Sequence, residues 1–345
     1  MIRSGIILFS LFVSATQAEA PINMTRPKVL ISNPSVPAAA LELLKEKCDL
    51  IVSPSDEKNS ILNLVEGVEA IFWATHVKLD NEIIEKAGAQ LKLIASMSAG
   101  YNHVDLKELK KRGIKLSNTP GVLSNAVADI AMLLALGTSR RLTEGRFHIE
   151  RGTWGADTNN TQWMLGTDLE GSTVGIVGLG GIGQAIAKRL KGFDVARILY
   201  TGHREKSEGA SLGAQFVDLD VLTKESDFIF LSAPLTNETM NMCNGTFFSK
   251  MRRTAILINV SRGQLVDQAA LIGALKEGQI FAVGLDVMVP EPLPIDSELL
   301  KLPNVVLTPH LGSATVNTRN AMAQLTAKNI LLALEGEELL TPVKF

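Results

Sequence analysis

Short apolar runs alternate with amphipathic stretches through the first third of the chain. Runs of four to six residues that predict β-strands stand at Lys28–Ser32, Ala70–Ala74, Leu91–Ser96 and Ile114–Ser117. The stretches between them have helical spacing, most clearly at Ala38–Lys47, Asp80–Ala87 and Leu106–Arg112. Apolar strands separated by helices of about ten residues indicate a parallel sheet with helices on both faces.

A second alternating block begins at Ser172. Its six predicted strands are Thr173–Val177, Arg197–Tyr200, Phe228–Leu231, Ala255–Asn259, Ala282–Leu285 and Val305–Leu307. Six strands with helical crossovers make a complete doubly wound unit. A final helix is predicted at Thr318–Leu334. The predicted fold class is therefore α/β, with two doubly wound parallel-sheet domains.

Residues 123–142 form a long helical candidate that joins the two blocks. The stretch is apolar around most of its circumference, so we expect it to be buried between domains or between subunits. Residues 152–168 follow in a polar, irregular setting that contains Trp154 and Trp163. Two interpretations stay open for this segment: a surface loop held by two rings, or an arm that crosses a dimer.

Composition narrows the range of functions. The chain has 345 residues, of which 20% are charged and 46% apolar, with a formal net charge of −2. This is the balance of a globular protein of two domains, and the absence of a long basic run argues against nucleic acid and anionic membranes as partners. Cys48 and Cys243 lie in no CxxC or Cys/His cluster, which excludes a structural zinc site and argues against a disulfide framework.

Residues 1–23 do not fit the rest of the pattern. Apolar residues 5–13 follow Arg3 and lead to several alanines, which is a signal-peptide pattern too short to span a bilayer stably. From Met24 onward, the sequence reads as the start of a cytosolic chain. We expect a cytoplasmic protein if translation starts at Met24 or the segment is not used as a signal, with the secretory pathway through residues 1–20 as the alternative.

The strand Thr173–Val177 runs directly into a glycine-rich turn and then a helix. The turn, Gly178-Leu179-Gly180-Gly181-Ile182-Gly183, matches G-x-G-x-x-G in the strand–turn–helix context that dinucleotide binding requires. Gly178 permits the turn, Gly180 lets the backbone approach a pyrophosphate, and Gly183 lets the helix pack on the strand. The helix N-terminus offers free N–H groups to the phosphates. We therefore predict cofactor contacts at Gly178, Gly180, Gly181, Ile182 and Gly183.

The end of the next strand predicts which nicotinamide dinucleotide binds. The Asp or Glu that would hydrogen-bond the ribose of NAD is absent after Tyr200, and His203 and Arg204 stand there instead. A guanidinium suits a 2′-phosphate because it is positive and rich in donors. We predict NADPH as the cofactor, with NADH as a weaker alternative.

Three more loops follow strands of the second block and carry Arg262, Glu291 and His310. The carboxyl ends of strands line the ligand site of an open α/β sheet, so these side chains are expected to meet. Arginine clamps a carboxylate through paired hydrogen bonds, and a histidine with a carboxylate partner can hold and donate a proton near neutral pH. This set suits the reduction of a 2-oxo acid.

With these motifs the sequence resembles the D-isomer-specific 2-hydroxyacid dehydrogenases, from about Lys28 to about Pro342. The motifs that carry the resemblance, in the family's order and spacing, are the glycine loop, Ser261-Arg262-Gly263, Glu291-Pro292 and Pro309-His310-Leu311-Gly312. Three further segments are most similar to the branch that reduces glyoxylate and hydroxypyruvate: Tyr200-Thr201-Gly202, Glu291-Pro292-Leu293-Pro294 and Gly312-Ser313-Ala314-Thr315.

The resemblance implies a domain arrangement, in which a Rossmann cofactor domain is inserted into a flavodoxin-like substrate domain. Residues 24–121 would begin the substrate domain and residues 310–345 would close it. Residues 122–309 would form the cofactor domain with a dimerisation arm, and the protein would be a homodimer.

The resemblance also implies a role for each site residue. His310 would protonate the substrate carbonyl, Glu291 would hold His310, and Arg262 would bind the substrate carboxylate. Further contacts would come from Ser98, Ala99, Gly100 and Ser313 to the substrate, and from Ser232, Val260, Asp286 and Gly312 to the cofactor or substrate. No role is predicted for His76 or His103. The alternatives are a dehydrogenase of the same family with another substrate, and a cofactor-sensing, corepressor-like interaction protein.

Overall fold

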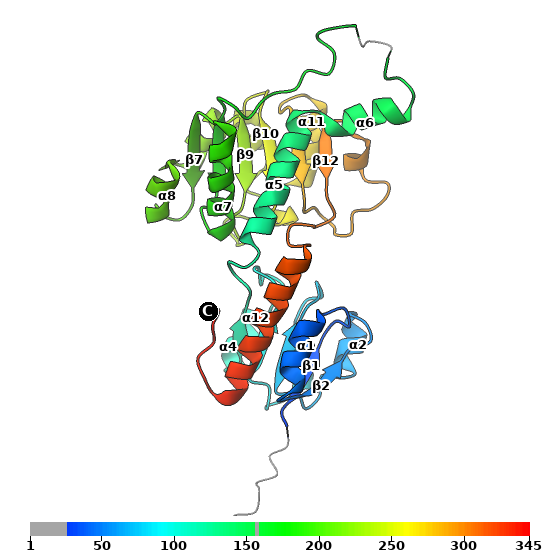
Figure 1. The fold of residues 1–345 in the computed structure, drawn as a ribbon, viewed down its shortest axis with the longest axis vertical. Coiled ribbons are helices and arrows are strands. Elements are labelled where there is room, and N and C mark those ends of the chain that lie inside the picture. The colour runs from blue at the N-terminus through cyan, green and yellow to red at the C-terminus, as the bar shows by residue number, and fades with distance from the viewer. Residues whose placement is uncertain (1–25, 156–158) are drawn as a thin grey trace, which may run out of the picture.

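The computed structural model describes residues 26–155 and 159–345, which form two parallel sheets at opposite ends of the molecule's long axis (Figure 1). The first sheet has the order β2-β1-β3-β4-β5, and the second has the order β12-β11-β10-β9-β6-β7-β8. The first is the flavodoxin-like order, and the second contains the Rossmann order with one extra strand at an edge. The predicted fold class is confirmed.

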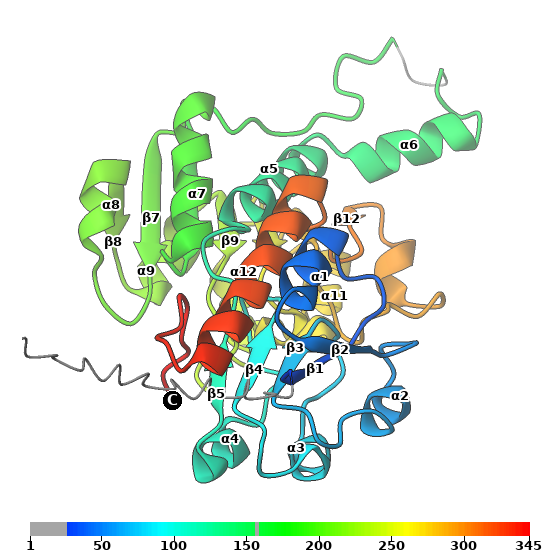
Figure 2. The same cartoon turned by 60° about the horizontal axis from the view of Figure 1, so that its bottom comes forward.

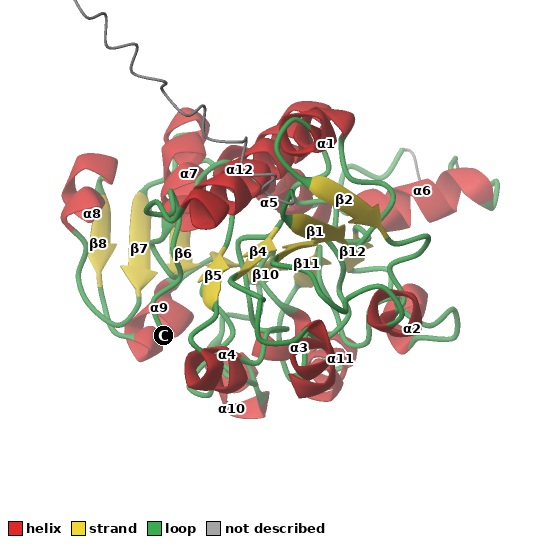
Figure 3. Ribbon diagram, turned by 90° about the horizontal axis from the view of Figure 1, so that it is seen from below, coloured by secondary structure: helices red, strands yellow, loops and turns green. Residues whose placement is uncertain are grey.

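The first sheet is covered by helices on both faces, with α1 and α12 (Val316–Glu335) on one side and α3 and α4 on the other (Figure 3). Its strands are β1 (Lys28–Ile31), β2 (Asp49–Val52), β3 (Ala70–Trp73), β4 (Leu93–Ser96) and β5 (Lys115–Ser117). Its helices are α1 (Ala38–Lys45), α2 (Lys58–Leu62), α3 (Asn81–Ala87) and α4 (Leu106–Arg112). Sequence analysis missed β2, an edge strand in which no residue is fully buried, so its apolar signal is weak.

The second sheet has seven strands rather than the six predicted. They are β6 (Thr173–Val177), β7 (Arg197–Thr201), β8 (Ala214–Phe216), β9 (Phe228–Leu231), β10 (Ile256–Asn259), β11 (Ala282–Leu285) and β12 (Val305–Leu307). The additional strand, β8, has three residues, lies at the edge and exposes two of them, so nothing in its sequence marks it as buried.

Helices flank this sheet as well. They are α7 (Gly181–Leu190), α8 (Ser207–Leu212), α9 (Leu219–Glu225), α10 (Gly245–Lys250) and α11 (Gln268–Lys276), with 3₁₀ turns at Lys191–Phe193, Gly263–Leu265 and Glu298–Lys301. Helix α5 (Ser124–Ser139) packs on α7, β10 and β11. A Cβ on Gly284 of β11 would lie 2.8 Å from Cβ of Leu134, so a side chain there would push α5 away from the sheet.

The helix predicted at 123–142 is α5, most of whose residues are buried, and a second helix that the sequence analysis did not predict follows it. α5 ends at Ser139, and α6 (Leu142–Glu150) begins after Arg141, whose left-handed backbone (φ 54°) breaks the helical path. No residue of α6 is buried. Figures 1 and 2 show α6 and the segment after it extending away from the two sheets.

The chain returns to the first sheet through its last helix, α12 (Val316–Glu335), which packs on α1, β3 and β4 (Figure 2). A bridge between Ser117 and Pro342 ties the C-terminal segment to the end of β5. In the described parts of the chain, no helix is long and apolar enough to cross a membrane. The signal-like residues 1–23 lie outside the described residues.

Candidate active site

The glycine-rich turn joins β6 to α7 and requires glycine at two positions for different reasons. Gly178 has φ +95°, and a Cβ there would lie 2.8 Å from the backbone nitrogen of Ala233. A Cβ on Gly183 would overlap the carbonyl oxygen of Gly178, so α7 can approach the turn only with glycine at this point. At Gly180 a Cβ would meet no atom within 4 Å, so the backbone there is open to a ligand.

The N-terminus of α7 has no side-chain cap, which leaves its first N–H groups available to anionic oxygens. Ser232, after β9, donates a 2.6 Å hydrogen bond to the carbonyl of Gly178 and supports the turn from the next strand. These features fit a dinucleotide pyrophosphate.

His203 and Arg204 follow β7 and are both exposed. They lie close to the glycine turn, because the N–H of Gly178 bonds the carbonyl of Thr201 at the end of the same strand (2.9 Å). Arg204 forms no ion pair with any described residue, so its guanidinium is free to bind an anion.

His310 and Glu291 form the central pair of the site. Nδ1 of His310 lies 2.7 Å from Oε2 of Glu291, and each side chain is about one-third exposed. Oε1 of Glu291 accepts the N–H of Met288 (3.1 Å). Burial opposes ionisation of Glu291, but its hydrogen bond with His310 and the nearby positive charge outweigh that effect and lower the pKa of Glu291.

Asp286, which is 1% exposed, holds the backbone of the loop that carries His310. Its carboxylate accepts Thr308 Oγ1 (2.6 Å) and the N–H groups of Leu311 (2.7 Å) and Gly312 (2.8 Å). His310 itself has a left-handed backbone with φ 54°, an unfavourable conformation for a residue with a Cβ. The three bonds to Asp286 stabilise the loop in the form that directs His310 toward Glu291.

Arg262 follows β10 and reaches across to the first sheet's domain. Its Nε donates to Oδ1 of Asn102 (2.9 Å), its Nη1 donates to the carbonyl of Ser261 (2.7 Å), and its guanidinium lies against Gly100. Burial lowers the pKa of Arg262, and the side chain still carries its charge at neutral pH. Nη2 has no hydrogen-bond partner among the described residues, so it is available to a ligand.

Ser98, Ala99 and Gly100 form the loop after β4, opposite Arg262. Asn118 Nδ2 holds the carbonyl of Ala99 (2.7 Å), and Ser98 Oγ donates to the carbonyl of Gly100. The N–H groups of Ala99 and Gly100 donate to no acceptor in the described chain, which leaves two backbone donors beside the arginine.

The predicted residues thus gather in two places. The His310–Glu291 pair and Arg262 lie near enough for the charge of Glu291 to act on Arg262, and both reach the first domain, at His76 and Asn102 respectively. We call the set Arg262, Glu291 and His310, with Gly100 and Asn102, the junction site. The glycine turn with His203 and Arg204 lies at the carboxyl ends of β6 and β7. Val260 is nearly buried beside Arg262, and Ser313 follows the loop that Asp286 holds.

The structure adds two histidines that sequence reasoning left without a role. The ring of His76, on the loop after β3, lies 5.4 Å from the ring of His310 (centroid to centroid) at a tilt of 44°. His103 lies 3.5 Å from Ser96 Oγ. Burial, with the charges of Arg262 and His76, lowers the pKa of His103 to about 4. Burial and the charge of His310 lower the pKa of His76 as well, so both rings are neutral at pH 7.

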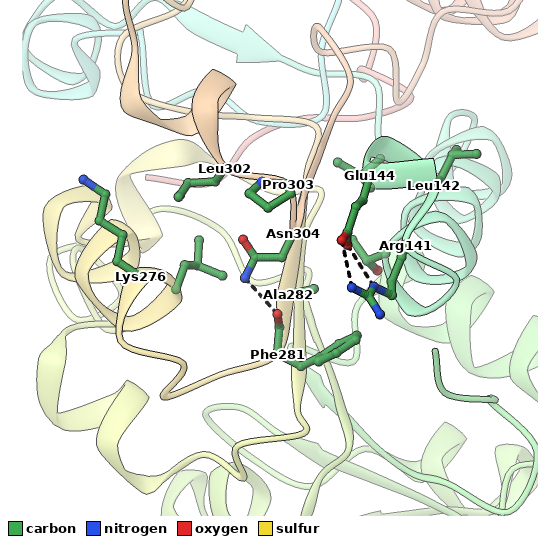
Figure 4. A pocket seen from close by; sticks show the side chains of 12 residues that line it. Arg141, Leu142, Glu144, Lys276, Phe281, Ala282, Leu302, Pro303 and Asn304 are labelled. Atoms are coloured by element: carbon green, nitrogen blue, oxygen red, sulfur yellow. Dashed lines mark hydrogen bonds and ion pairs between the residues drawn. The ribbon is translucent and has the colours of Figure 1, made fainter. Parts of the chain in front are cut away.

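A pocket of about 490 Å³ lies away from this chemistry, between the start of α6, the end of α11 and β12 (Figure 4). On one side Arg141 and Glu144 form an ion pair at 2.8 Å, and on the other Asn304 bonds the carbonyl of Phe281 (2.9 Å). The pocket borders Leu142 at the start of α6, and no residue of the junction site lines it.

Comparison with known proteins gives consistent matches. A family model described as "D-isomer specific 2-hydroxyacid dehydrogenase, NAD binding domain" matches residues 132–312. Glyoxylate reductase/hydroxypyruvate reductase of Mus musculus is 45% identical over 92% of this chain and 98% of its own length, and glyoxylate reductase of Pyrococcus furiosus is 42% identical over 90% and 94%. A crystal structure of an NADPH-dependent glyoxylate/hydroxypyruvate reductase from Sinorhizobium meliloti, in complex with NADP and malonate, covers 92% of this chain and 97% of its own at 34% identity (TM-score 0.80).

Proposed function

The chain belongs to the D-isomer-specific 2-hydroxyacid dehydrogenases, and we propose that it uses NADPH to reduce glyoxylate to glycolate and hydroxypyruvate to D-glycerate. The observation that carries the proposal is the junction site, where a His–Glu pair and a partly free arginine meet two unused backbone donors. The relatives named above support the choice of substrates.

The residues of the glycine turn fit the proposed cofactor. Gly178, Gly180 and the N-terminus of α7 would hold the pyrophosphate, and Arg204, with His203, would hold the 2′-phosphate. When bound, the nicotinamide supplies the hydride for the reduction. NADH would bind more weakly, because it offers nothing to the positive charge of Arg204.

His310 is the proposed proton donor. Glu291 occupies Nδ1, so the ring keeps one orientation and leaves Nε2 as the nitrogen that donates to the substrate's C2 oxygen. The negative charge of Glu291 compensates the charge of the ring before the proton is transferred. Asp286 positions this pair indirectly, since its carboxylate fixes the backbone that carries His310.

Arg262 is the proposed carboxylate anchor. Its bonds to Asn102 and Ser261 fix the plane of the guanidinium and leave Nη2 directed into the junction site. The N–H groups of Ala99 and Gly100 would bind the same carboxylate from the other domain. A 2-oxo acid held by these three donors presents its carbonyl to His310.

The test is to mix the purified protein with NADPH and either glyoxylate or hydroxypyruvate. NADPH oxidation is measured as the loss of NADPH absorbance. We expect turnover with both substrates. The variant H310A should lose more than about 100-fold in kcat while its Kd for NADPH stays within about 2-fold, because a general acid acts in the chemical step. No oxidation of NADPH or NADH with a panel of 2-oxo acids would refute the proposal.

We also propose that the protein is a homodimer formed through α5, α6 and the segment that follows. Apolar side chains exposed on this surface are Leu133, Leu136, Leu142, Ile149, Trp154 and Leu165. Ile149 is 64% exposed and Trp154 63% exposed, although α6 itself contacts α5 and β12. A second copy, related by two-fold symmetry, would cover such a self-complementary apolar face.

Light scattering after size exclusion tests the dimer. We expect twice the chain mass for the wild type and a single chain mass for L142D/I149D, which places two carboxylates in the covered face. A wild type that is monomeric at micromolar concentration would contradict the proposal.

A further inference from the structure

His76 borders the junction site, and the proposed mechanism does not use it. It lies on the loop after β3, in the domain opposite His310, and its ring contacts the ring of the proposed proton donor at 5.4 Å. Within the described residues, neither ring nitrogen of His76 has a hydrogen-bond partner. An unpaired polar ring beside the reacting group is placed to bind the substrate.

The groups around C2 of the substrate can be assigned to binding partners one by one. A 2-oxo acid has three groups around C2, of which Arg262 takes the carboxylate and His310 the oxygen. We place the third group toward the first domain, where Gly100 has no side chain and Asn102 is already bonded to Arg262. Among the described residues of that domain, His76 is the side chain whose ring contacts His310.

The chemistry of the ring indicates what this third group can be. The His76 imidazole is neutral at pH 7, since burial and the charges of His310 and Arg262 disfavour a second cation beside them. A neutral imidazole offers one N–H donor and one nitrogen acceptor. This matches a hydroxyl group, which donates and accepts, and does not match a carboxylate, which only accepts.

We infer that His76 is a specificity-determining residue that hydrogen-bonds the C3 hydroxyl of hydroxypyruvate. The inference rests on the proposed function. Glyoxylate carries only hydrogen at this position, and pyruvate carries a methyl group, so neither substrate gains from His76. The residue therefore discriminates between substrates by what they carry beyond C2.

The experiment compares three substrates with two variants in the full-length protein. H76F keeps a ring against His310 but removes both hydrogen-bonding atoms, whereas H76Q keeps a donor and an acceptor. For H76F we expect kcat/KM for hydroxypyruvate to fall about 2- to 12-fold, the value of one neutral hydrogen bond, with changes below about 2-fold for glyoxylate and pyruvate. H76Q should recover part of the loss.

The three substrates separate the possible failures. Equal loss for all three in H76F would overturn the inference, because His76 would then act through His310 rather than on the substituent. Unchanged kcat/KM for hydroxypyruvate would overturn it as well. Glyoxylate turnover by H76F shows that the variant is folded. A wild type that reduces neither glyoxylate nor hydroxypyruvate would instead refute the proposed function.

Discussion

A methyl group added at Gly100 would test how closely the two domains cooperate at the junction site. A Cβ there would overlap Nη2 of Arg262 and lie 2.9 Å from its Cζ. Because the obstructed group is the end of a long side chain, the guanidinium can move and the fold should survive. The displaced nitrogen is Nη2, which is the one proposed to bind the substrate carboxylate. The hydrogen bond from Nε to Asn102 would also be strained or lost.

A displacement of about 1 Å at a substrate-positioning group can cost roughly 100-fold in rate. We therefore expect G100A to lower kcat/KM for both substrates by about 10- to 100-fold, mainly through KM, because a carboxylate anchor binds ground state and transition state alike. The Kd for NADPH should change less than about 2-fold. The matched control is G273A in α11, where a Cβ would meet no atom within 4 Å and activity should be unchanged.

A double-mutant cycle gives the decisive comparison. If G100A acts by moving Arg262, adding G100A to R262A should lower kcat/KM little further, since the effects of two substitutions that act through one contact are not additive. The assay is NADPH oxidation at saturating cofactor over a wide range of substrate concentration. A G100A effect of the same size with and without Arg262 would refute this reasoning and place the damage in the backbone of the loop.

Four further predictions follow from single features. His103 should make stability pH-dependent: its pKa is about 4 folded and about 6.5 unfolded, so the unfolded state takes up the proton first and stability falls as pH drops from 6.5 to 4. The free energy of unfolding should fall by about 3 kcal/mol over this pH range. Denaturant unfolding of H103N should show a smaller fall, and an equal fall in the wild type and H103N would contradict this prediction. D286N should lower Tm by roughly 2–6 °C and reduce kcat, since an amide N–H would face a loop donor at a cost of about 1–3 kcal/mol; an unchanged melting curve would argue against it. R204A should weaken NADPH binding about 10- to 100-fold and NADH binding less than about 2-fold, as measured by titration, and an unchanged preference would place the 2′-phosphate contact elsewhere. The full chain and a form that starts at Met24, each with a C-terminal fluorescent tag, should both be cytoplasmic; secretory labelling of the longer form alone would show a working signal.

The sequence predicted the parts of the site that depend on one sheet. β10, β11 and β12 are neighbours in the order of the second sheet, so the loops after them, which carry Arg262, Asp286 and His310, lie at one edge. Apolar runs reveal buried strands, and the carboxyl ends of parallel strands meet on the same side. The short edge strands β2 and β8 escaped because they are too exposed to give such a run.

Contacts between the domains could not be read in the same way. His76 and Asn102 reach the junction site only because the two sheets face each other, and periodicity within a segment carries no information about that placement. The one available signal was position: each residue lies a few places after a buried strand of the first sheet. That rule selects loops, but it cannot tell His76, which contacts His310, from His103, which faces Ser96.

This difference in predictability has a functional consequence. The second domain holds the proposed acid, its carboxylate partner and the arginine on loops that Asp286 and the sheet fix independently of the first domain. The first domain contributes a loop backbone, Asn102 and the ring of His76, which bear on the arginine and on the substrate's substituent. Substitutions of these residues in the second domain should therefore lower kcat/KM for every 2-oxo acid, whereas those at His76 should alter the ranking of substrates. A His76 variant that prefers a different 2-oxo acid and keeps the wild-type kcat would support this division of roles between the domains most directly.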